Sequence, residues 1–146
     1  MKRLERHVGL LVLGMLLCAQ APSPSEVEIV VVVNSASPPK QMVRKSASEV
    51  FMFKRQFWAN REPIVIVLQL NDVALHAAFC AKVLETPCDA RDQAELERKY
   101  QGNLFARVLR ANSSAEAALL LQQNPMAIGY FRRGNAPANA QIVFQP

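Results

Sequence analysis

Few side chains in this sequence have types and spacings suited to chemistry, and they form no catalytic set. A serine nucleophile needs a base beside it, but the serines lack the Gly-x-Ser-x-Gly turn and the chain has two histidines, His7 and His76. His76 falls inside a predicted helix, where we expect a solvated side chain. The five glycines form neither a Gly-x-Gly-x-x-Gly nor a P-loop motif. We therefore expect a protein that is not an enzyme and has no cofactor.

Two acidic pairs are the remaining candidates for general acid and base chemistry. Asp89 with Asp92 and Glu95 with Glu97 all fall in one predicted helix. Helix surfaces carry such charges routinely, so we interpret these carboxylates as a solvated helix face.

The cysteines point to a disulfide. Cys80 lies near the end of a predicted helix, and Thr86-Pro87 turns the chain just before Cys88, so the second sulfur can fold back on the first. A loop this small adds ~2 kcal/mol of stability. The alternative is two unpaired thiols, one of them in the core. We expect no metal site, because no ligand spacing joins His76 to the cysteines.

The first 21 residues have the order of a secretory signal peptide. Lys2, Arg3 and Arg6 precede an apolar run over residues 8–17, and Ala19-Gln20-Ala21 follows. The run is about half of the ~20 residues that a membrane-spanning helix needs, so we expect no membrane span after cleavage and a periplasmic product. Cys18 is an alternative lipid-attachment site, but such a cysteine usually follows a small residue and Leu17 is not small.

Length and charge limit the remaining classes. A chain of 146 residues can form one compact domain, which we place at residues 27–146 after a flexible Pro/Ser arm at 22–26. The formal charge is +5, of which the leader contributes +2. The basic residues after the leader are scattered among acids and do not alternate with aromatic residues, so we expect no nucleic-acid binding.

Apolar runs predict the strands of one sheet. Residues 27–33 and 64–68 are rich in valine and isoleucine and predict strands covered on both faces. Residues 127–131 and 141–144 predict two shorter strands. The predicted order of elements is β-α-β-α-α-α-β-β, which favours an α/β fold, a three-layer sandwich with a mixed sheet.

Capping residues predict the helices between these strands. Ser46 with Glu49 and Ser113 with Glu116 have the spacing of capping boxes. The helix from Ser46 is expected to bury Val50, Phe51 and Phe53. Asn71 or Asp72 is expected to cap a second helix, which turns Leu75, Phe79 and Val83 to the core. Asp89 is expected to cap a third helix, with Leu96 and Tyr100 on one face.

The order of motifs resembles the phosphate-type substrate-binding proteins of ABC transporters. Val-Val-Val-Asn at 31–34 leads through a Ser/Pro loop to Val-Phe-Met-Phe-Lys at 50–54, then to Trp58 and to Pro63-Ile64. Residues 124–130 read Asn-Pro-Met-Ala-Ile-Gly-Tyr, similar to the family's Asn-Pro-Gly-Ala-Ile-Gly-Tyr, and Tyr130 is expected to begin an edge of the sheet. The likeness spans roughly residues 28–144 and implies one lobe of a type 2 periplasmic-binding-protein-like fold.

The sequence also departs from this family. Phe53 and Arg61 stand where the family has glycine in Phe-x-Gly-Lys and Gly-x-Pro-Ile. The family's Arg-x-x-x-Ser-Gly-Thr motif is replaced by Gln-Leu-Asn-Asp-Val-Ala at 69–74, and Asp72 would repel a phosphate dianion at a helix start. The roughly 125 residues after the leader are about half of a two-lobed binding protein that closes by a hinge motion.

Two functions follow from the resemblance. The first is an exported, non-enzymatic solute-binding-like protein for a small solute or oxyanion. Its ligand site is expected at the carboxyl ends of the strands. The predicted ligand-binding residues are Asn34, Ser35, Ser37, Gln69, Asn71 and Asp72. The alternative, which the residue types favour, is that these are ordinary loop and cap residues. The alternative function is an envelope protein-interaction adaptor, which an exposed apolar patch at the place of a missing lobe would favour.

Overall fold

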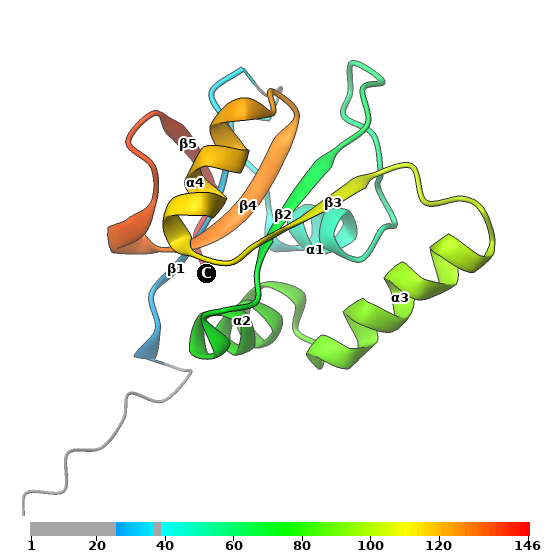
Figure 1. The fold of residues 1–146 in the computed structure, drawn as a ribbon, viewed down its shortest axis with the longest axis horizontal. Coiled ribbons are helices and arrows are strands. Elements are labelled where there is room, and N and C mark those ends of the chain that lie inside the picture. Colours follow the sequence, from blue (N-terminus) through cyan, green and yellow to red (C-terminus); the bar gives the residue numbers. More distant parts are fainter. Residues whose placement is uncertain (1–25, 37–38) are drawn as a thin grey trace, which may run out of the picture.

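A computed structural model describes residues 26–36 and 39–146 of the chain (Figure 1). The strands are β1 Ile29–Asn34, β2 Val65–Gln69, β3 Arg107–Ala111, β4 Ala127–Arg132 and β5 Ala140–Phe144. The helices are α1 Arg44–Phe51, α2 Val73–Phe79, α3 Cys88–Tyr100 and α4 Ser114–Gln123, with a π-helical turn Cys80–Leu84 after α2 and a 3-10 turn Arg133–Asn135 after β4. The predicted signal peptide, most of the predicted arm and Ser37 lie outside the described residues.

The strands form one mixed sheet, as predicted. Its order is β3-β2-β4-β1-β5, with β2 parallel to both β3 and β4. Strand β1 is antiparallel to its two neighbours, β4 and β5, and therefore runs opposite to the other four strands. The reversed direction of β1 decides which side chains meet at each end of the sheet.

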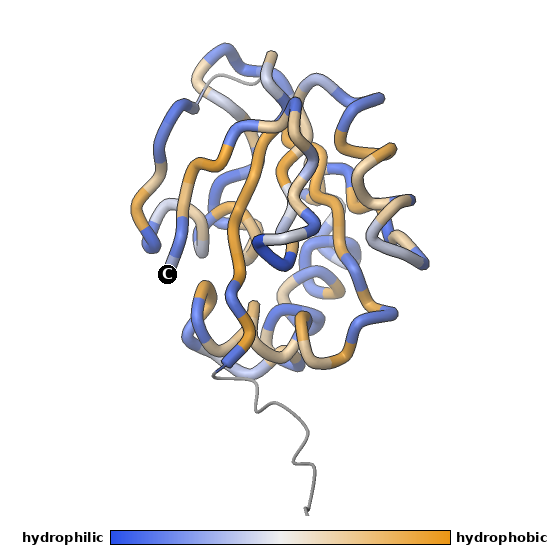
Figure 2. Tube along the Cα trace, turned by 90° about the vertical axis from the view of Figure 1, so that its left-hand side faces the viewer, coloured by the Kyte–Doolittle hydropathy of each residue, from blue (hydrophilic) through white to orange (hydrophobic). Residues whose placement is uncertain are grey.

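Helices cover both faces of the sheet and give the predicted three-layer α/β sandwich. On one face, Val31 and Ile66 pack in a core with residues of α1 and α2. On the other face, Val30, Val67 and Phe131 pack against α4 (Figure 1). The central strands β1, β2 and β4 are almost wholly buried and mostly apolar, because both of their faces are covered (Figure 2). Within the described residues, no helix is long and apolar enough to cross a membrane.

Two predicted helix caps are confirmed. Asp72 caps α2, and its Oδ1 accepts a hydrogen bond of 3.1 Å from the Leu75 N–H. Ser113 caps α4, and its Oγ accepts a hydrogen bond of 3.0 Å from the Glu116 N–H. The Glu116 carboxylate reaches back to the Asn112 N–H at 2.7 Å, so the reciprocal bond of the capping box falls one residue earlier than predicted.

The start of α1 and the existence of β3 correct the sequence analysis. Helix α1 begins at Arg44, and its N-cap Val43 makes no side-chain capping bond, so the predicted capping box at Ser46 is wrong. The buried face of α1, which includes the predicted Val50 and Phe51, fixes its position instead. Strand β3 was not predicted because its arginine-rich sequence lies at the edge of the sheet and lacks a long apolar run.

The buried face of α3 is ionic. The predicted face with Leu96 and Tyr100 is exposed, whereas Arg91 and Glu95 are fully buried. Arg91 Nη1 donates to Glu95 Oε2 at 2.7 Å, and Arg110 from β3 binds the same carboxylate at 2.9 Å. The prediction of a solvated carboxylate is therefore wrong for Glu95, because paired charges allow it to lie in the interior.

Two residues at the family's glycine positions keep a left-handed backbone. Phe53 has φ 59° and Arg61 has φ 67°, values that favour glycine and strain other residues. Phe53 is fully buried, as predicted, and its ring centroid lies 5.0 Å from the guanidinium carbon of Arg91. Both positions therefore have a backbone conformation that glycine would adopt without strain.

Candidate functional site

The predicted ligand-binding residues lie at two opposite ends of the sheet. Both β1 and β2 are neighbours of β4, but they run in opposite directions. Asn34 at the end of β1 therefore lies far along the strands from Gln69 at the end of β2. The prediction of a single site is wrong, because carboxyl ends converge at one edge only when the strands are parallel.

At the first end, Asn34 has a structural role. Its Nδ2 donates to the carbonyl oxygens of Leu121 at 2.9 Å and Gln122 at 3.2 Å, and its Oδ1 accepts from the Ala36 N–H at 2.9 Å. These bonds tie the end of β1 to the last turn of α4. The pocket beside it has a volume of about 120 Å³ and an uncharged lining of Asn34, Ser35, Leu121, Gln122, Asn139 and Ala140. Ser35 is exposed, and among the described residues the lining of this pocket carries no charge to hold an anion.

At the other end, Gln69 joins β2 to β4. Gln69 is buried, and its Nε2 donates to the Tyr130 carbonyl oxygen at 2.9 Å. The Gln69 N–H donates to the Tyr130 hydroxyl oxygen at 3.1 Å, and that hydroxyl donates to the Gln69 carbonyl oxygen at 3.2 Å. The amide nitrogen of Gln69 is therefore engaged inside the protein and does not face a ligand.

Tyr130 lies in the middle of the sheet, and the predicted edge position is wrong. Its ring stacks on Phe79 with a centroid separation of 3.9 Å, and its hydroxyl lies 2.7 Å from His76 Nδ1. Burial raises the pKa of Tyr130 above its ordinary value. Burial also lowers the pKa of His76. The charge of Asp92 acts to raise this pKa, and the charge of Arg91 acts to lower it. His76 is partly buried and bonded, so the predicted solvated side chain is also wrong.

Asp72 and Arg132 form the most organised polar group at this end. Arg132 donates from Nε to Asp72 Oδ2 at 2.7 Å and from Nη2 to Asp72 Oδ1 at 3.0 Å. The hydrogen bond from Arg132 lowers the pKa of Asp72 although partial burial acts to raise it, and the Leu75 N–H lowers it further. The same bond raises the pKa of Arg132. A carboxylate held by a guanidinium and a backbone N–H thus lies at the start of α2.

Sequence reasoning missed Arg132. A usable signal was present, because Arg132 follows a predicted strand directly, and a basic side chain at the carboxyl end of a parallel strand can face the start of a neighbouring helix. Of the other predicted residues at this end, Asn71 is exposed.

Apolar side chains flank the ion pair. Leu70 is 43% exposed and Val73 is 77% exposed. Beside them lies a pocket of about 280 Å³ with a lining of mixed charge, formed by Leu70, Asp92, Glu95, Leu96, Lys99 and Arg110. This end of the sheet therefore presents exposed apolar surface around a neutralised pair of charges.

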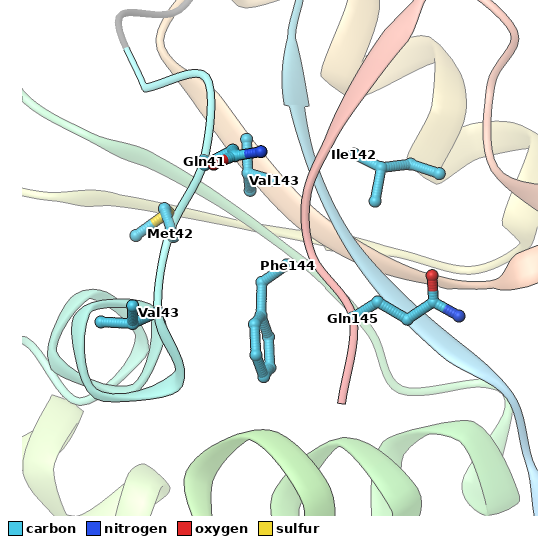
Figure 3. A pocket seen from close by; sticks show the side chains of 7 residues that line it. All are labelled: Gln41, Met42, Val43, Ile142, Val143, Phe144 and Gln145. Atoms are coloured by element: carbon cyan, nitrogen blue, oxygen red, sulfur yellow. The ribbon is translucent and has the colours of Figure 1, made fainter.

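A larger groove lies at the β5 edge of the sheet, between β5 and the segment before α1 (Figure 3). Its volume is about 410 Å³, and it is lined by Gln41, Met42, Val43, Ile142, Val143, Phe144 and Gln145. The Met42 N–H donates to the Val143 carbonyl oxygen at 2.8 Å and covers part of the strand edge. The lining carries no charged or nucleophilic side chain, so the groove supplies neither an anion site nor a catalytic group.

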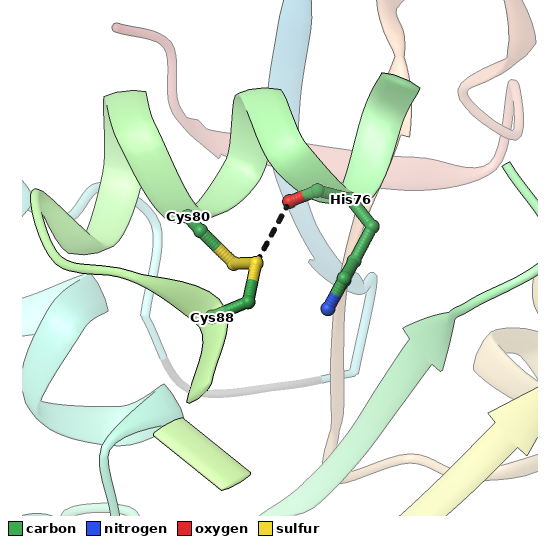
Figure 4. Close-up of side chains that lie close together, drawn as sticks. All are labelled: His76, Cys80 and Cys88. Atoms are coloured by element: carbon green, nitrogen blue, oxygen red, sulfur yellow. Dashed lines mark hydrogen bonds between the residues drawn. A yellow bond between two sulfur atoms is a disulfide. The ribbon is translucent and has the colours of Figure 1, made fainter. Parts of the chain in front are cut away.

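The predicted disulfide between Cys80 and Cys88 is confirmed, with a Cα–Cα distance of 5.4 Å. The ring of His76 lies next to the two sulfurs (Figure 4), and potential ligand atoms of the three residues all lie within 4.8 Å of one another. The sequence spacing did not predict this cluster, because the turn before α3 carries Cys88 back to the helix that holds His76 and Cys80.

Solved structures share the fold. The chain is similar to a protein from Clostridium perfringens described as a phosphate ABC transporter substrate-binding protein with bound phosphate, with a TM-score of 0.61 and 16% identity over 80% of this chain and 44% of that chain. It is also similar to an ABC-type phosphate transport receptor from Vibrio cholerae, with a TM-score of 0.52 and 14% identity over 80% of this chain and 45% of that one.

These likenesses establish the fold of a periplasmic-binding-protein lobe. The chain spans less than half of the length of either neighbour. No protein-family model and no curated protein matches the sequence.

Proposed function

We propose that this chain is an exported, non-enzymatic solute-binding-like protein that does not capture phosphate. The observation that carries the proposal is the position of Asp72. Its carboxylate occupies the start of α2 and is held by Arg132 and by the Leu75 N–H. In the resembling family, a phosphate oxyanion is expected at this helix start. A phosphate dianion would meet the negative charge of Asp72 here, and Arg132 is already engaged.

Export to the periplasm is part of the proposal. The order of a basic segment, an apolar run and small residues at positions 1–21 is that of a secretory signal peptide. The Cys80–Cys88 disulfide supports an oxidising compartment, because such bonds persist outside the cytosol.

Phosphate titration of the wild type and an Asp72→Asn variant tests the proposal. The melting temperature of the wild type should not change with added phosphate or sulfate. Asparagine also caps helices well, so Asp72→Asn keeps the start of α2 while it releases Arg132. The variant should therefore gain a phosphate-dependent stabilisation, reaching about 2.7 kcal/mol at a concentration 100 times its Kd.

Two control variants make this test specific. Asp92→Asn removes another carboxylate near this end and should gain no phosphate response. The double variant Asp72→Asn with Arg132→Gln should lose the gain, since the cation is gone. A wild-type protein that phosphate stabilises would overturn the proposal and would assign oxyanion capture to the chain.

A second candidate is an adaptor that contacts an envelope protein. The observation in its favour is the exposed apolar pair Leu70 and Val73 on either side of Asp72. The resemblance implies a second lobe facing this end, and the matched region spans 44% of one neighbour and 45% of the other. An envelope protein with an apolar surface would cover the same place.

Site-specific photo-crosslinking in cells tests the adaptor. A photoreactive amino acid at Val73 should give one defined adduct, whereas the same group at Leu119, which is exposed on α4, should give none. Equal labelling from both positions would argue against this surface as the contact site.

A further inference from the structure

Independently of the proposed function, we propose that His76, Cys80 and Cys88 bind Zn²⁺ when the disulfide is reduced. Potential ligand atoms of the three residues lie within 4.8 Å of one another. Two thiolates on a tetrahedral zinc are roughly 3.8 Å apart, given Zn–S bonds of about 2.3 Å. The Cys80–Cys88 Cα distance of 5.4 Å accommodates either the S–S bond or a shared metal after small side-chain rotations.

The backbone brings the three ligand residues close together before any metal binds. His76 and Cys80 are four residues apart along one continuous helical segment, so their side chains share a face. Glu85 has a left-handed backbone with φ 53°, and the turn that it starts leads the chain back to Cys88. Cys88 is the first residue of α3, where the helix dipole favours a negatively charged sulfur. Figure 4 shows the imidazole beside both sulfurs.

Tyr130 orients the histidine as a second layer around the site. The single proton of its hydroxyl is directed to the Gln69 carbonyl oxygen at 3.2 Å. With this proton on the Gln69 side, the proposal assigns the Nδ1–H tautomer to His76, which then donates to the hydroxyl oxygen at 2.7 Å and keeps the Nε2 lone pair for a metal. A ring N–H held by a neighbouring oxygen is the usual arrangement of histidines that ligate zinc.

Oxidation state controls whether the site exists. A dithiol reductant transfers two electrons and two protons to the disulfide, the S–S bond breaks, two thiols form, and the reductant becomes a disulfide. Zn²⁺ then displaces both thiol protons and binds two thiolates and one imidazole, a donor set that suits this ion. The fourth position remains for water. The oxidised protein has no thiolate to offer, so the disulfide closes the site.

Cobalt binding to the full chain tests the proposal. A Cys18→Ser background leaves Cys80 and Cys88 as the two cysteines. After reduction with dithiothreitol and its removal under nitrogen, one Co²⁺ should bind with thiolate-to-cobalt absorption, and one Zn²⁺ should displace it. The untreated, oxidised protein should show no such absorption.

Variants test the individual ligands. His76→Ala should shift the cobalt spectrum and weaken binding, whereas His7→Ala should bind as the background does. Tyr130→Phe should keep the spectrum but lower the affinity about 10- to 100-fold, since the histidine loses its orienting partner.

Three results would overturn the proposal. The first is a reduced protein with two free thiols by dye titration that binds no Co²⁺. The second is a His76→Ala variant with unchanged spectrum and affinity. The third is loss of the far-UV circular dichroism signal on reduction, because only the fold brings the three ligands together.

Discussion

Two ion pairs in this protein use the same chemistry in opposite surroundings. On α3, the side chains of Arg91 and Glu95 are 0% and 4% exposed, with an N–O distance of 2.7 Å. At the start of α2, the side chains of Arg132 and Asp72 are 37% and 27% exposed, also at 2.7 Å. Glu95 also binds Lys99 and Arg110, yet Nε and Nη2 of Arg91 have no hydrogen-bond partner.

The two ion pairs differ in how much they contribute to stability, because one is buried and the other is exposed. Removing charges from water costs several kcal/mol per ion, and the cost is offset only while every partner is present. The buried pair therefore makes α3 depend on its charges. An exposed pair contributes little to stability. The Asp72–Arg132 pair matters instead for the proposed function, because it occupies the helix start where we propose that no phosphate binds.

The substitution with the largest expected effect is Glu95→Gln. A neutral amide leaves the buried guanidinium of Arg91 with one remaining carboxylate, that of the exposed Asp92 at 3.2 Å, so the free energy of unfolding should fall by about 3–5 kcal/mol. Urea unfolding measures the loss. Glu97→Gln, on the exposed side of the same helix, should change it by less than about 0.5 kcal/mol.

A double variant sharpens this prediction. Arg91→Met combined with Glu95→Leu removes both buried charges and should be more stable than Glu95→Gln alone. If Glu95→Gln and Glu97→Gln were equally stable, the buried pair would carry no special weight and the comparison between the two pairs would fail.

The pH dependence of stability should follow the buried pair. Burial acts to raise the pKa of Glu95, but hydrogen bonds from Arg110 and Lys99 and the charge of Arg91 outweigh it and lower the pKa from 4.5 to about 2. A depressed acid pKa contributes stability that is present above pH 4.5 and is lost as the pH falls towards 2. Asp72, whose pKa is also lowered, acts in the same direction.

Urea unfolding at several pH values tests this dependence. The curves of the wild type and Glu95→Gln should converge between pH 4.5 and 2, because the wild-type carboxylate becomes protonated there. If the stabilities of the two proteins instead differed by a constant amount over that range, the contacts of Glu95 would not lower its pKa.

Local patterns predicted local structure. The apolar runs located β1 and β2 because both faces of these strands are covered, and Ser113 and Asp72 identified helix starts because a cap bonds within its own turn. The disulfide was predictable from the turn before Cys88.

Long-range pairing was not predictable in the same way. The partner of Asp72 is 60 residues away in sequence, and Arg110 binds Glu95 across 15 residues. The direction of β1 depends on its pairing with β4 and β5, which no periodicity within β1 encodes. The single predicted site failed for this reason, since Asn34 ends a strand that runs opposite to β2.

Phe53 and Arg61 both have a left-handed backbone, but Phe53 is buried and Arg61 is exposed. Phe53→Gly relieves backbone strain but removes a fully buried ring beside Arg91, so we expect a net loss of about 2–3 kcal/mol. Arg61 is exposed, and Arg61→Gly should raise the free energy of unfolding by about 1 kcal/mol. Thermal and urea unfolding measure both. Glu62→Gly should give no gain, and a gain as large as that of Arg61→Gly would exclude strain as the cause.

The smallest expected effect belongs to the exposed pair. Arg132→Gln leaves Asp72 as the cap of α2, and the free energy of unfolding should fall by less than about 1 kcal/mol, because solvent screens both charges. Added salt should shrink this loss further, whereas the loss in Glu95→Gln should change little. Arg133→Gln, one residue further along and exposed, is the matched control. A loss in Arg132→Gln as large as that in Glu95→Gln would show that the Asp72–Arg132 pair stabilises the fold. The position of Asp72 at the start of α2 would then be explained by stability, without the proposed exclusion of phosphate.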